Sequence, residues 1–301
     1  MTTRMLVGTK SGLWQARDTP LEPVNEFTTR TVSALAQSGD EAWAIADGRI
    51  VAQRNGGRWT DRASLVNQRA TCLAATPNGV LIGTTEAHLF LLDDTLEPVE
   101  SFETVDGRET WHTPWGDPAD VRSIAVDLDG AIYVNVHVGG VVRSRDAGRS
   151  WSPTVDIAAD VHQVIAHPTC ARTVLAAAAA GFGVSRDGGD SWQFITDGMD
   201  ASYARAIAVA GDTVLVSTST GPRGHRAALY RKVLDRDMPF ERCRDGLPWF
   251  ESNIDTGCLA AQGSAVVFGT DDGRLFRSLD GGAPWVLQSD RLPGITAVTL
   301  A

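Results

Sequence analysis

Three copies of one eight-residue pattern, Ser-x-Asp-x-Gly-x-x-Trp, constrain the fold of this chain more tightly than any other feature. The copies begin at Ser144, Ser185 and Ser278 and end at Trp151, Trp192 and Trp285. In each copy the Asp is expected to accept hydrogen bonds from backbone amides two residues further on, as in an Asx turn, and the Gly supplies a positive φ. The Trp then starts the next strand and packs over the turn. The pattern predicts a repeated tight hairpin, which indicates a repeat protein.

A short apolar strand also recurs along the whole chain. Its central residues are spaced by 38 to 52 positions and are Leu35, Leu73, Ile124, Val164, Ile207, Leu259 and Val298. Repeats of roughly 40–50 residues are typical of propeller blades built from four-stranded sheets. The sequence therefore predicts an all-β fold, a seven-bladed β-propeller of four-stranded antiparallel blades.

The two ends of the chain are expected to share one blade. Residues 295–301 supply only a first strand, whereas residues 5–15 echo the second and third strands of blade six at 267–276. Sharing a blade closes the ring and removes open sheet edges. We expect one domain over 1–301, with blades at about 30–68, 69–120, 121–160, 161–202, 203–254, 255–294, and 295–301 plus 1–29.

Composition narrows the partners. The formal net charge is −10, which argues against nucleic acid and anionic membranes. No apolar signal segment follows Met1 and no apolar run is long enough to span a membrane. The four cysteines are scattered without a CxxC pair, so we expect a cytoplasmic protein with free thiols.

The three motif copies resemble the Asp-box, also called the BNR repeat, of sialidases and related β-propellers. The resemblance covers the whole chain as architecture and extends to xyloglucanase-like and photosystem II assembly-factor-like propellers. It implies the fold and not a reaction, because the Asp-box lies on turns away from the active site in that family. Bacterial lyases on seven-bladed propellers, which use His and Glu with a metal, are similar by fold analogy only.

The chain departs from the sialidase pattern in two respects. The Phe-Arg-Ile-Pro segment near the start is absent, and seven repeats are counted where sialidases have six blades. The sialidase arginine triad, acid Asp and Tyr–Glu pair therefore have no residue-by-residue match here, although Arg122, Arg205 and Tyr203 would supply similar groups.

Polar side chains crowd the start of the innermost strands in blades three to six, where ligand sites of propellers usually form around a central funnel. The predicted acid–base residues there are Asp120, Asp160, His162, Tyr203 and Asp255. Two carboxyl groups can serve as acid and base if their pKa values are pushed apart. Arg122 and Arg205 are expected to hold an anionic group, because guanidinium forks match carboxylates.

Three unusual loop stretches, 110–118, 221–226 and 247–253, are expected to reach the same face. Loops on a rigid scaffold are where binding residues concentrate. The predicted substrate-binding residues in them are Trp111, Trp115, Arg223, Arg226, Trp249 and Asn253.

His112, His137 and His162 all map near the funnel mouth, although they lie far apart in sequence. Three imidazoles with a carboxylate would bind a divalent transition metal and leave a coordination position open. The alternative is that they are hydrogen-bonded rim histidines. Cys258 near His162 is either a nucleophile or a small hydrophobe packed between blades.

Two functions follow from this reading. The first is an enzyme of hydrolase or lyase type, with or without metal assistance, that acts on a small anionic or ring-bearing molecule in the central funnel. The alternative is a non-catalytic binding or assembly propeller that uses the same face for a partner. An enzyme needs convergent, accessible Asp, His and Arg side chains, whereas a scaffold would present a wide apolar patch around Trp111, Trp115, Trp249 and Phe250. Rim charges that only form structural ion pairs would support neither.

Overall fold

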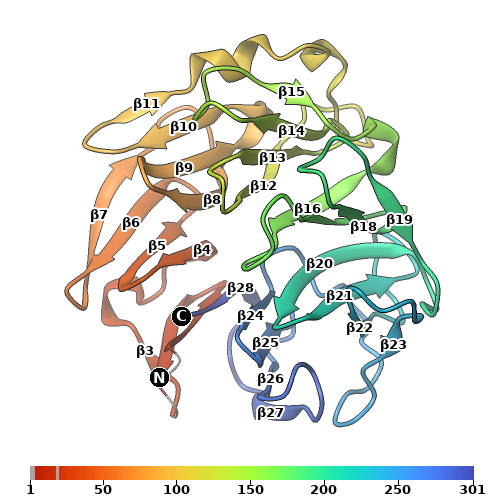
Figure 1. The fold of residues 1–301 in the computed structure, drawn as a ribbon. Helices are drawn as coiled ribbons and strands as arrows, with labels where there is room; N and C mark the ends of the chain where they lie inside the picture. The colour runs from red at the N-terminus through yellow and green to blue at the C-terminus, as the bar shows by residue number, and fades with distance from the viewer. Residues whose placement is uncertain (1–3, 18–19) are drawn as a thin grey trace.

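The computed structural model describes residues 4–17 and 20–301. Within this part of the chain, the strands pair into seven four-stranded antiparallel sheets, which stand around a common axis (Figure 1). The prediction of a seven-bladed β-propeller is therefore confirmed. The expected blade limits, which also assign the connecting loops, remain a prediction.

One sheet contains both ends of the chain. It joins β28 (Ile295–Leu300) to β1 (Arg4–Thr9), β2 (Gly12–Arg17) and β3 (Glu22–Pro23). The termini lie near each other in Figure 1, and Ala301 and Arg4 exchange backbone hydrogen bonds of 2.6 and 2.9 Å. This confirms that the N- and C-terminal strands share blade seven and close the ring.

The other six sheets follow one another in chain order. Blades one and two contain β4 (Val32–Ser38), β5 (Glu41–Ala46), β6 (Ile50–Asn55) and β7 (Arg58–Ser64), then β8 (Ala70–Thr76), β9 (Gly79–Thr84), β10 (Leu89–Leu92) and β11 (Leu96–Pro98). Blades three and four contain β12 (Val121–Val126), β13 (Ile132–Val136), β14 (Gly140–Ser144) and β15 (Ser152–Pro153), then β16 (Val161–Ala166), β17 (Val174–Ala178), β18 (Gly181–Ser185) and β19 (Gln193–Ile195). Blades five and six contain β20 (Tyr203–Ala210), β21 (Thr213–Ser219), β22 (Ala228–Val233) and β23 (Glu241–Arg242), then β24 (Leu259–Gln262), β25 (Ala265–Gly269), β26 (Leu275–Ser278) and β27 (Val286–Ser289).

Short 3₁₀ turns occupy some of the connections. They are η1 (Asn25–Phe27), η2 (Thr85–Ala87), η3 (Glu100–Thr104), η4 (Arg108–Thr110) and η5 (Ile157–Ala159). None of the helical turns in the described residues has the length and apolar character needed to cross a membrane.

Seven apolar clusters fill the gaps between neighbouring blades. The central strands are buried on both faces, so they are apolar throughout rather than alternating. Along β13, Ile132 and Val134 pack toward blade two and Tyr133 packs toward blade four. Small residues let the blades approach closely, and a Cβ on Gly83 would clash with Val121 of the next blade.

The motif turns are held by side-chain hydrogen bonds, with a register that differs from the expectation. The carboxylate of Asp146 accepts from the amides of Arg149 (3.1 Å) and Ser150 (2.9 Å), which lie three and four residues on rather than two. Asp187 accepts from the Ser191 amide in the same way, at 2.9 Å. The reason for the wider reach is that the Ser hydroxyl at the start of the motif fills the nearer position, since Ser144 Oγ accepts from the Gly148 amide at 2.8 Å.

Candidate functional site

A β-bulge lies near the start of most of the innermost strands, and it places the rim side chains. In β12 the register passes from Val121 opposite Val136 to Ser123 opposite Asn135, so Arg122 is left without a partner in β13. Bulges re-aim the extra residue and are frequent next to functional sites. The residues skipped in the same way are Ser33, Thr71, His162 and Thr296, and in β20 the shift spans Arg205 and Ala206.

The loops that lead into these strands share one face with the turns between second and third strands, as expected. The amide of His137, in the turn after β13, donates to the carbonyl of Asp120 at 2.9 Å. The amide of Ala179, in the turn after β17, donates to the carbonyl of Asp160 at 3.0 Å. Below this face the central channel contains a cavity of about 200 Å³ whose lining includes Thr71 and Arg122.

Arg122 is the unpaired cation of the mouth. Its half-buried guanidinium makes no ion pair and no hydrogen bond with any described residue. Burial, followed by the neighbouring charge of Arg205, lowers the pKa of Arg122 to about 10, against the opposing charge of Asp160. A buried cation without a partner is costly, so an anion at this point would be bound favourably.

Arg205 is already neutralised. Its Nε and Nη2 atoms both donate to Asp255 Oδ1, at 2.9 and 2.6 Å. The same guanidinium lies 5.9 Å from the centre of the Tyr203 ring. The structure therefore brings Tyr203, Arg205 and Asp255 together, but as an internal ion pair beside an aromatic ring.

His162 is completely buried, with 0% of its surface exposed. Its Nδ1 lies 2.5 Å from the carbonyl oxygen of Ala204 on the next blade. Because a carbonyl only accepts, Nδ1 carries the proton. Its Nε2 has no hydrogen-bond partner and lies 3.5 Å from Asp160 Oδ2. Burial lowers the pKa of His162, so the ring is neutral at neutral pH.

The two predicted rim carboxylates differ in their electrostatics. Burial raises the pKa of Asp120, despite the opposing effects of the Glu86 backbone and of Arg122. Burial would also raise the pKa of Asp160, but the pKa lies below its ordinary value, and the permanent charge of Arg122 acts in that direction. Asp160 Oδ1 is buried and has no hydrogen-bond partner. The pKa values of Asp120 and Asp160 are thus shifted in opposite directions, as an acid and base pair requires.

His137 lies within the electrostatic influence of Arg122, Asp160 and His162. Burial, and then the charge of Arg122, lowers the pKa of His137 to about 4. The ring of Trp115, which is 69% exposed, stands edge-on to His137 with a centroid separation of 5.4 Å. Among the three predicted tryptophans, Trp115 is the one whose ring contacts a residue of the mouth.

Asn135 is a member of this region that the sequence reasoning missed. It is fully buried on β13 and lies two residues before His137. The two side chains are therefore on the same face, the one that packs toward blade four. Neither its side-chain nitrogen nor its oxygen has a partner. The sequence signal that could have identified it is a single Asn within the apolar run 132–136, because buried side-chain amides normally have hydrogen-bond partners.

The other loop residues are not brought to the mouth. Trp111 packs on Phe102, with ring centroids 5.7 Å apart, and lies under Arg108. Trp249 packs against the guanidinium of Arg242, 3.4 Å from the ring centre, and also lies 4.7 Å from that of Arg226. Since Arg242 is on the outermost strand β23, this stack lies away from the channel. The predicted funnel roles of Trp111, Arg226 and Trp249 therefore conflict with the contacts that these side chains make.

Of two further loop residues, one forms hydrogen bonds between loops and the other is exposed to solvent. Asn253 donates to the carbonyl oxygens of Gly221 and Pro222, at 3.4 and 3.1 Å, and so ties two loops together. Arg223 is exposed and makes no ion pair with the described residues.

The expected metal ligand set is not assembled. No group of three His, Cys, Asp or Glu side chains in residues 4–17 and 20–301 is placed to hold a metal ion. His112 lies exposed on its loop and bonds the Thr110 carbonyl at 2.9 Å, while His162 is turned by its bond to Ala204. Cys258 is buried, and burial raises its pKa to about 12, so it remains a thiol, which corrects the nucleophile alternative.

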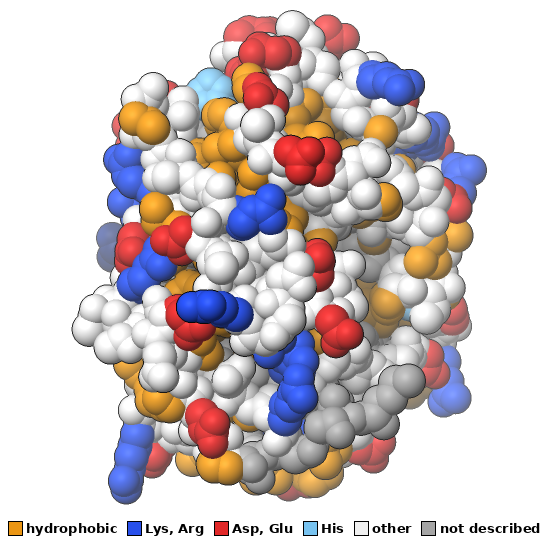
Figure 2. Space-filling model, turned by 90° about the vertical axis from the view of Figure 1, so that its left-hand side faces the viewer, with side chains coloured by type: hydrophobic (Ala, Val, Ile, Leu, Met, Phe, Trp, Pro, Cys, Tyr) orange, Lys and Arg blue, Asp and Glu red, His pale blue; other side chains and the backbone are white. Residues whose placement is uncertain are grey.

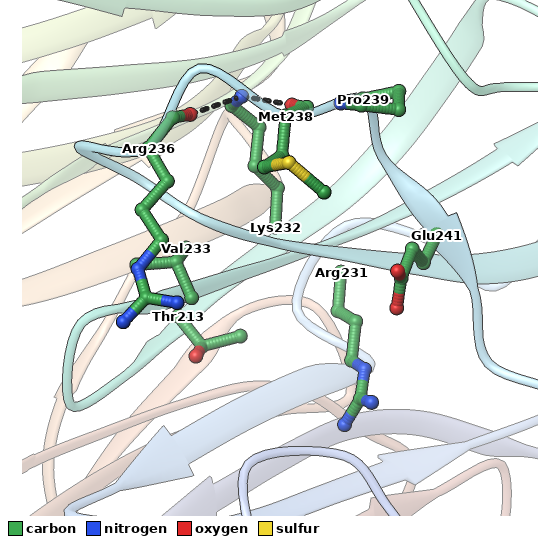
Figure 3. Close-up of a pocket in the computed structure, with 8 residues that line it drawn as sticks. All are labelled: Thr213, Arg231, Lys232, Val233, Arg236, Met238, Pro239 and Glu241. Atoms are coloured by element: carbon green, nitrogen blue, oxygen red, sulfur yellow. Dashed lines mark hydrogen bonds between the residues drawn. The ribbon is translucent and has the colours of Figure 1, made fainter.

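Another cavity, of about 290 Å³, lies on the outer part of blade five (Figure 3). Its basic residues include Lys232, whose ammonium donates to the carbonyl oxygens of Arg236 and Met238. The sticks in Figure 3 show this ammonium turned to the backbone rather than into the cavity. The place lacks the convergent His, Asp and Arg groups of the funnel mouth.

No protein-family model matches the sequence, and no curated protein matches it. Solved structures do match. The GH74 xyloglucanase from Xanthomonas campestris has a TM-score of 0.63 at 16% identity, over 95% of this chain and 46% of that chain. YCF48 from Cyanidioschyzon merolae has a TM-score of 0.60 at 16% identity, over 92% and 89%.

The extracellular domain of the hybrid two-component system BT3049 from B. thetaiotaomicron has a TM-score of 0.65 at 16% identity, over 92% of this chain and 36% of that chain. This chain thus spans less than half of the xyloglucanase and BT3049 chains. At these identities the likeness establishes the β-propeller fold and nothing about activity.

Proposed function

We propose that the funnel mouth binds a small anionic molecule through Arg122 and acts on it as an enzyme of hydrolase or lyase type. The observation that carries the proposal is the contrast between two neighbouring guanidinium groups. Arg205 is paired with Asp255, whereas Arg122 has no partner among the described residues. An anion can therefore bind Arg122 without displacing an internal carboxylate, and a guanidinium fork favours a carboxylate.

His137 is the general base in this proposal. Its imidazole is neutral at neutral pH, because burial and Arg122 hold its pKa at about 4. A bound anion offsets the charge of Arg122 and so raises the pKa of His137 toward the range in which general bases work well. Binding thereby prepares the base.

The chemical step follows from that position. In a lyase reaction His137 takes a proton from a carbon of the bound molecule. The electron pair of that C–H bond forms the new double bond, and the leaving group departs with the electron pair of the bond that held it to the neighbouring carbon. In a hydrolase reaction it takes a proton from the attacking water. In this proposal Asp120, which lies beside His137 and whose pKa is raised by burial, returns a proton to the leaving group. In this proposal Trp115, whose ring contacts His137, holds the bound molecule beside the base.

A binding propeller without catalysis is the second candidate, and one observation favours it. The bond from His162 to Ala204 repeats bonds that Thr71 and Thr296 make to Val121 and Val32 of their own next blades. His162 therefore has a structural role that needs no reaction. The broad apolar partner surface is not supported, because Trp111, Trp249 and Phe250 are packed into the molecule.

The resemblance to Asp-box propellers is supported by the hydrogen bonds of the turns at Asp146 and Asp187. A cytoplasmic location and a lack of nucleic-acid and membrane partners remain proposals that rest on the cysteine pattern and on the net charge of −10. We do not propose a metal, since the donor side chains do not converge.

Isothermal titration with acetate, benzoate and glucuronate tests the proposal. We expect saturable binding of at least one carboxylate to the wild-type chain and its loss in Arg122→Gln. Arg149→Gln is the matched control, because it removes an exposed arginine from the motif turn of blade three, at the end of the blade opposite the mouth. Binding that is unchanged in Arg122→Gln contradicts the proposal. Turnover of a bound compound, lost in His137→Gln with binding retained, separates the enzyme from the binding module.

A further inference from the structure

A cavity of about 400 Å³ lies between blade seven and blade one, at the end of the ring opposite the funnel mouth. Strand β1 reaches the mouth at Thr9, which pairs with Ile295, so its first residue, Arg4, lies at the opposite end. The lining is dominated by three arginines, Arg4, Arg17 and Arg54, and also contains Gln15, Ala16, Pro20 and Glu22.

The three arginines come from three strands. Arg4 and Arg17 are directly opposite each other in the antiparallel pair of β1 and β2. Like charges in that relation destabilise a sheet. Arg54 approaches from β6 of blade one and is only 8% exposed. None of the three forms an ion pair with a carboxylate of the described residues.

Arg54 occupies a place where other blades bury a small hydroxyl. Arg54 is the fifth residue of β6, and Ser144 is the fifth residue of β14. Arg54 is paired with Ala42 near the start of β5, and Ser144 is paired with Ile132 at the start of β13. Ser144 is 1% exposed and holds its turn together. In blade one the motif has degraded to residues 54–59, and a guanidinium fills the buried position instead.

Among the described residues, no carboxylate is paired with the arginines of this cavity. Burial lowers the pKa of Arg54, and the charges of Arg4 and Arg17 lower it further, against the opposing charges of Asp40 and Glu26. The Nε atoms of Arg4 and Arg54 are buried without hydrogen-bond partners. On the side of the molecule shown in Figure 2, basic side chains are otherwise dispersed among acidic ones. The three arginines, which form no ion pair with the described residues, are therefore a local concentration of positive charge in a protein with net charge −10.

We propose that this cavity is a second binding site, separate from the funnel, for the phosphate group of a small hydroxyl-bearing molecule. Guanidinium forks match phosphate oxygens, and a dianion neutralises more of the cluster than a carboxylate does. The volume exceeds that of a phosphate group and leaves room for the rest of the molecule. Gln15 and Glu22 also line the cavity, and an amide and a carboxylate can accept hydrogen bonds from the hydroxyl groups of such a molecule.

The test uses the full chain, with glucose 6-phosphate, pyrophosphate and unphosphorylated glucose as probes at constant ionic strength. We expect saturable binding of glucose 6-phosphate and pyrophosphate by isothermal titration, a concentration-dependent rise in melting temperature, and no response to glucose. The absence of saturable binding by both phosphate compounds overturns the proposal.

Two variants locate the site, and a third is the control. Arg54→Gln is expected to lower phosphate affinity by about tenfold or more, while its ligand-free melting temperature stays at or above that of the wild type, because a buried unpaired cation has been removed. Arg17→Gln changes an exposed position, so folding is not at risk, and should weaken binding in the same direction. Arg58→Gln removes an exposed arginine just past the turn and should bind as the wild type does. Undiminished binding in Arg17→Gln, or a ligand-free Arg54→Gln that is clearly destabilised, assigns these arginines a structural role and overturns the proposal.

Discussion

The Nδ1 atom of His162 donates a hydrogen bond to the carbonyl oxygen of Ala204, 2.5 Å away on the neighbouring blade. Thr71 and Thr296, at the same bulge position in other blades, donate to Val121 and Val32 in the same relation. One bulge thus serves two purposes: it turns a side chain toward the channel, and it links consecutive blades. At His162 the bond also leaves Nε2 as the unprotonated nitrogen, facing Asp160.

The shared bond predicts how substitutions at position 162 rank in stability. His162→Thr should retain the link to Ala204 and therefore be more stable than His162→Ala by about 1 kcal/mol, although both shorter side chains leave a cavity. His162→Ala loses the bond and leaves a cavity in a fully buried site, so it should cost about 2 kcal/mol or more. Urea unfolding of the two variants measures the difference. Equal destabilisation by Thr and Ala would show that the imidazole is needed for another reason.

The lowered pKa of His137 predicts an acid-sensitive contribution to stability. Its ordinary value of 6.5 applies to the unfolded chain, and the folded value is about 4. Between these values the unfolded state binds more protons, so lowering the pH through this window favours unfolding. The unfolding free energy should therefore fall as the pH goes from about 6.5 to about 4.

His162 and His167 also have lowered pKa values and act in the same direction. The comparison is therefore made between the wild type and His137→Gln, in which the slope with pH should be smaller but not zero. An identical slope in the two proteins would mean that His137 is not held neutral by the fold.

The motif turns offer an internal comparison between an intact and an altered copy. The carboxylate of Asp187 accepts from the amide and the hydroxyl of Ser191, at 2.9 and 2.6 Å. In the third copy Pro284 replaces that serine and has no N–H to donate, and the Asp280 carboxylate makes no hydrogen bond with any described residue. Asp187→Ala should lower the melting temperature clearly more than Asp280→Ala. A larger effect at Asp280 would contradict this account of the turns.

The sequence predicted the ring because repeats report on the fold directly. The motif at Ser144 and Ser185 marks one turn of a blade, and the spacing of residues such as Leu73 and Val164 sets the blade count. The closure by residues 295–301 and 5–15 followed from counting strands. These features depend on local hydrogen bonding and on strand periodicity, both of which are written in short stretches of sequence.

The site was predictable only where the strand framework determines position. Arg122, His137 and Asp160 lie together because bulges and turns of adjacent strands place them. Trp249 was misplaced because its loop folds outward onto Arg242, a contact that no local pattern encodes. The pairing of Arg205 with Asp255, fifty residues apart, likewise depends on which blades are neighbours and on rotamers.

The most direct test of the funnel site is the pKa of the His137 side chain, followed by NMR during an acetate titration at constant ionic strength. We expect the pKa of His137 to start near 4 and to rise saturably as acetate binds at Arg122. In Arg122→Gln the starting pKa should already be higher and should not respond to acetate. A His137 pKa that is insensitive both to acetate and to the loss of Arg122 would contradict an anion site at the funnel mouth.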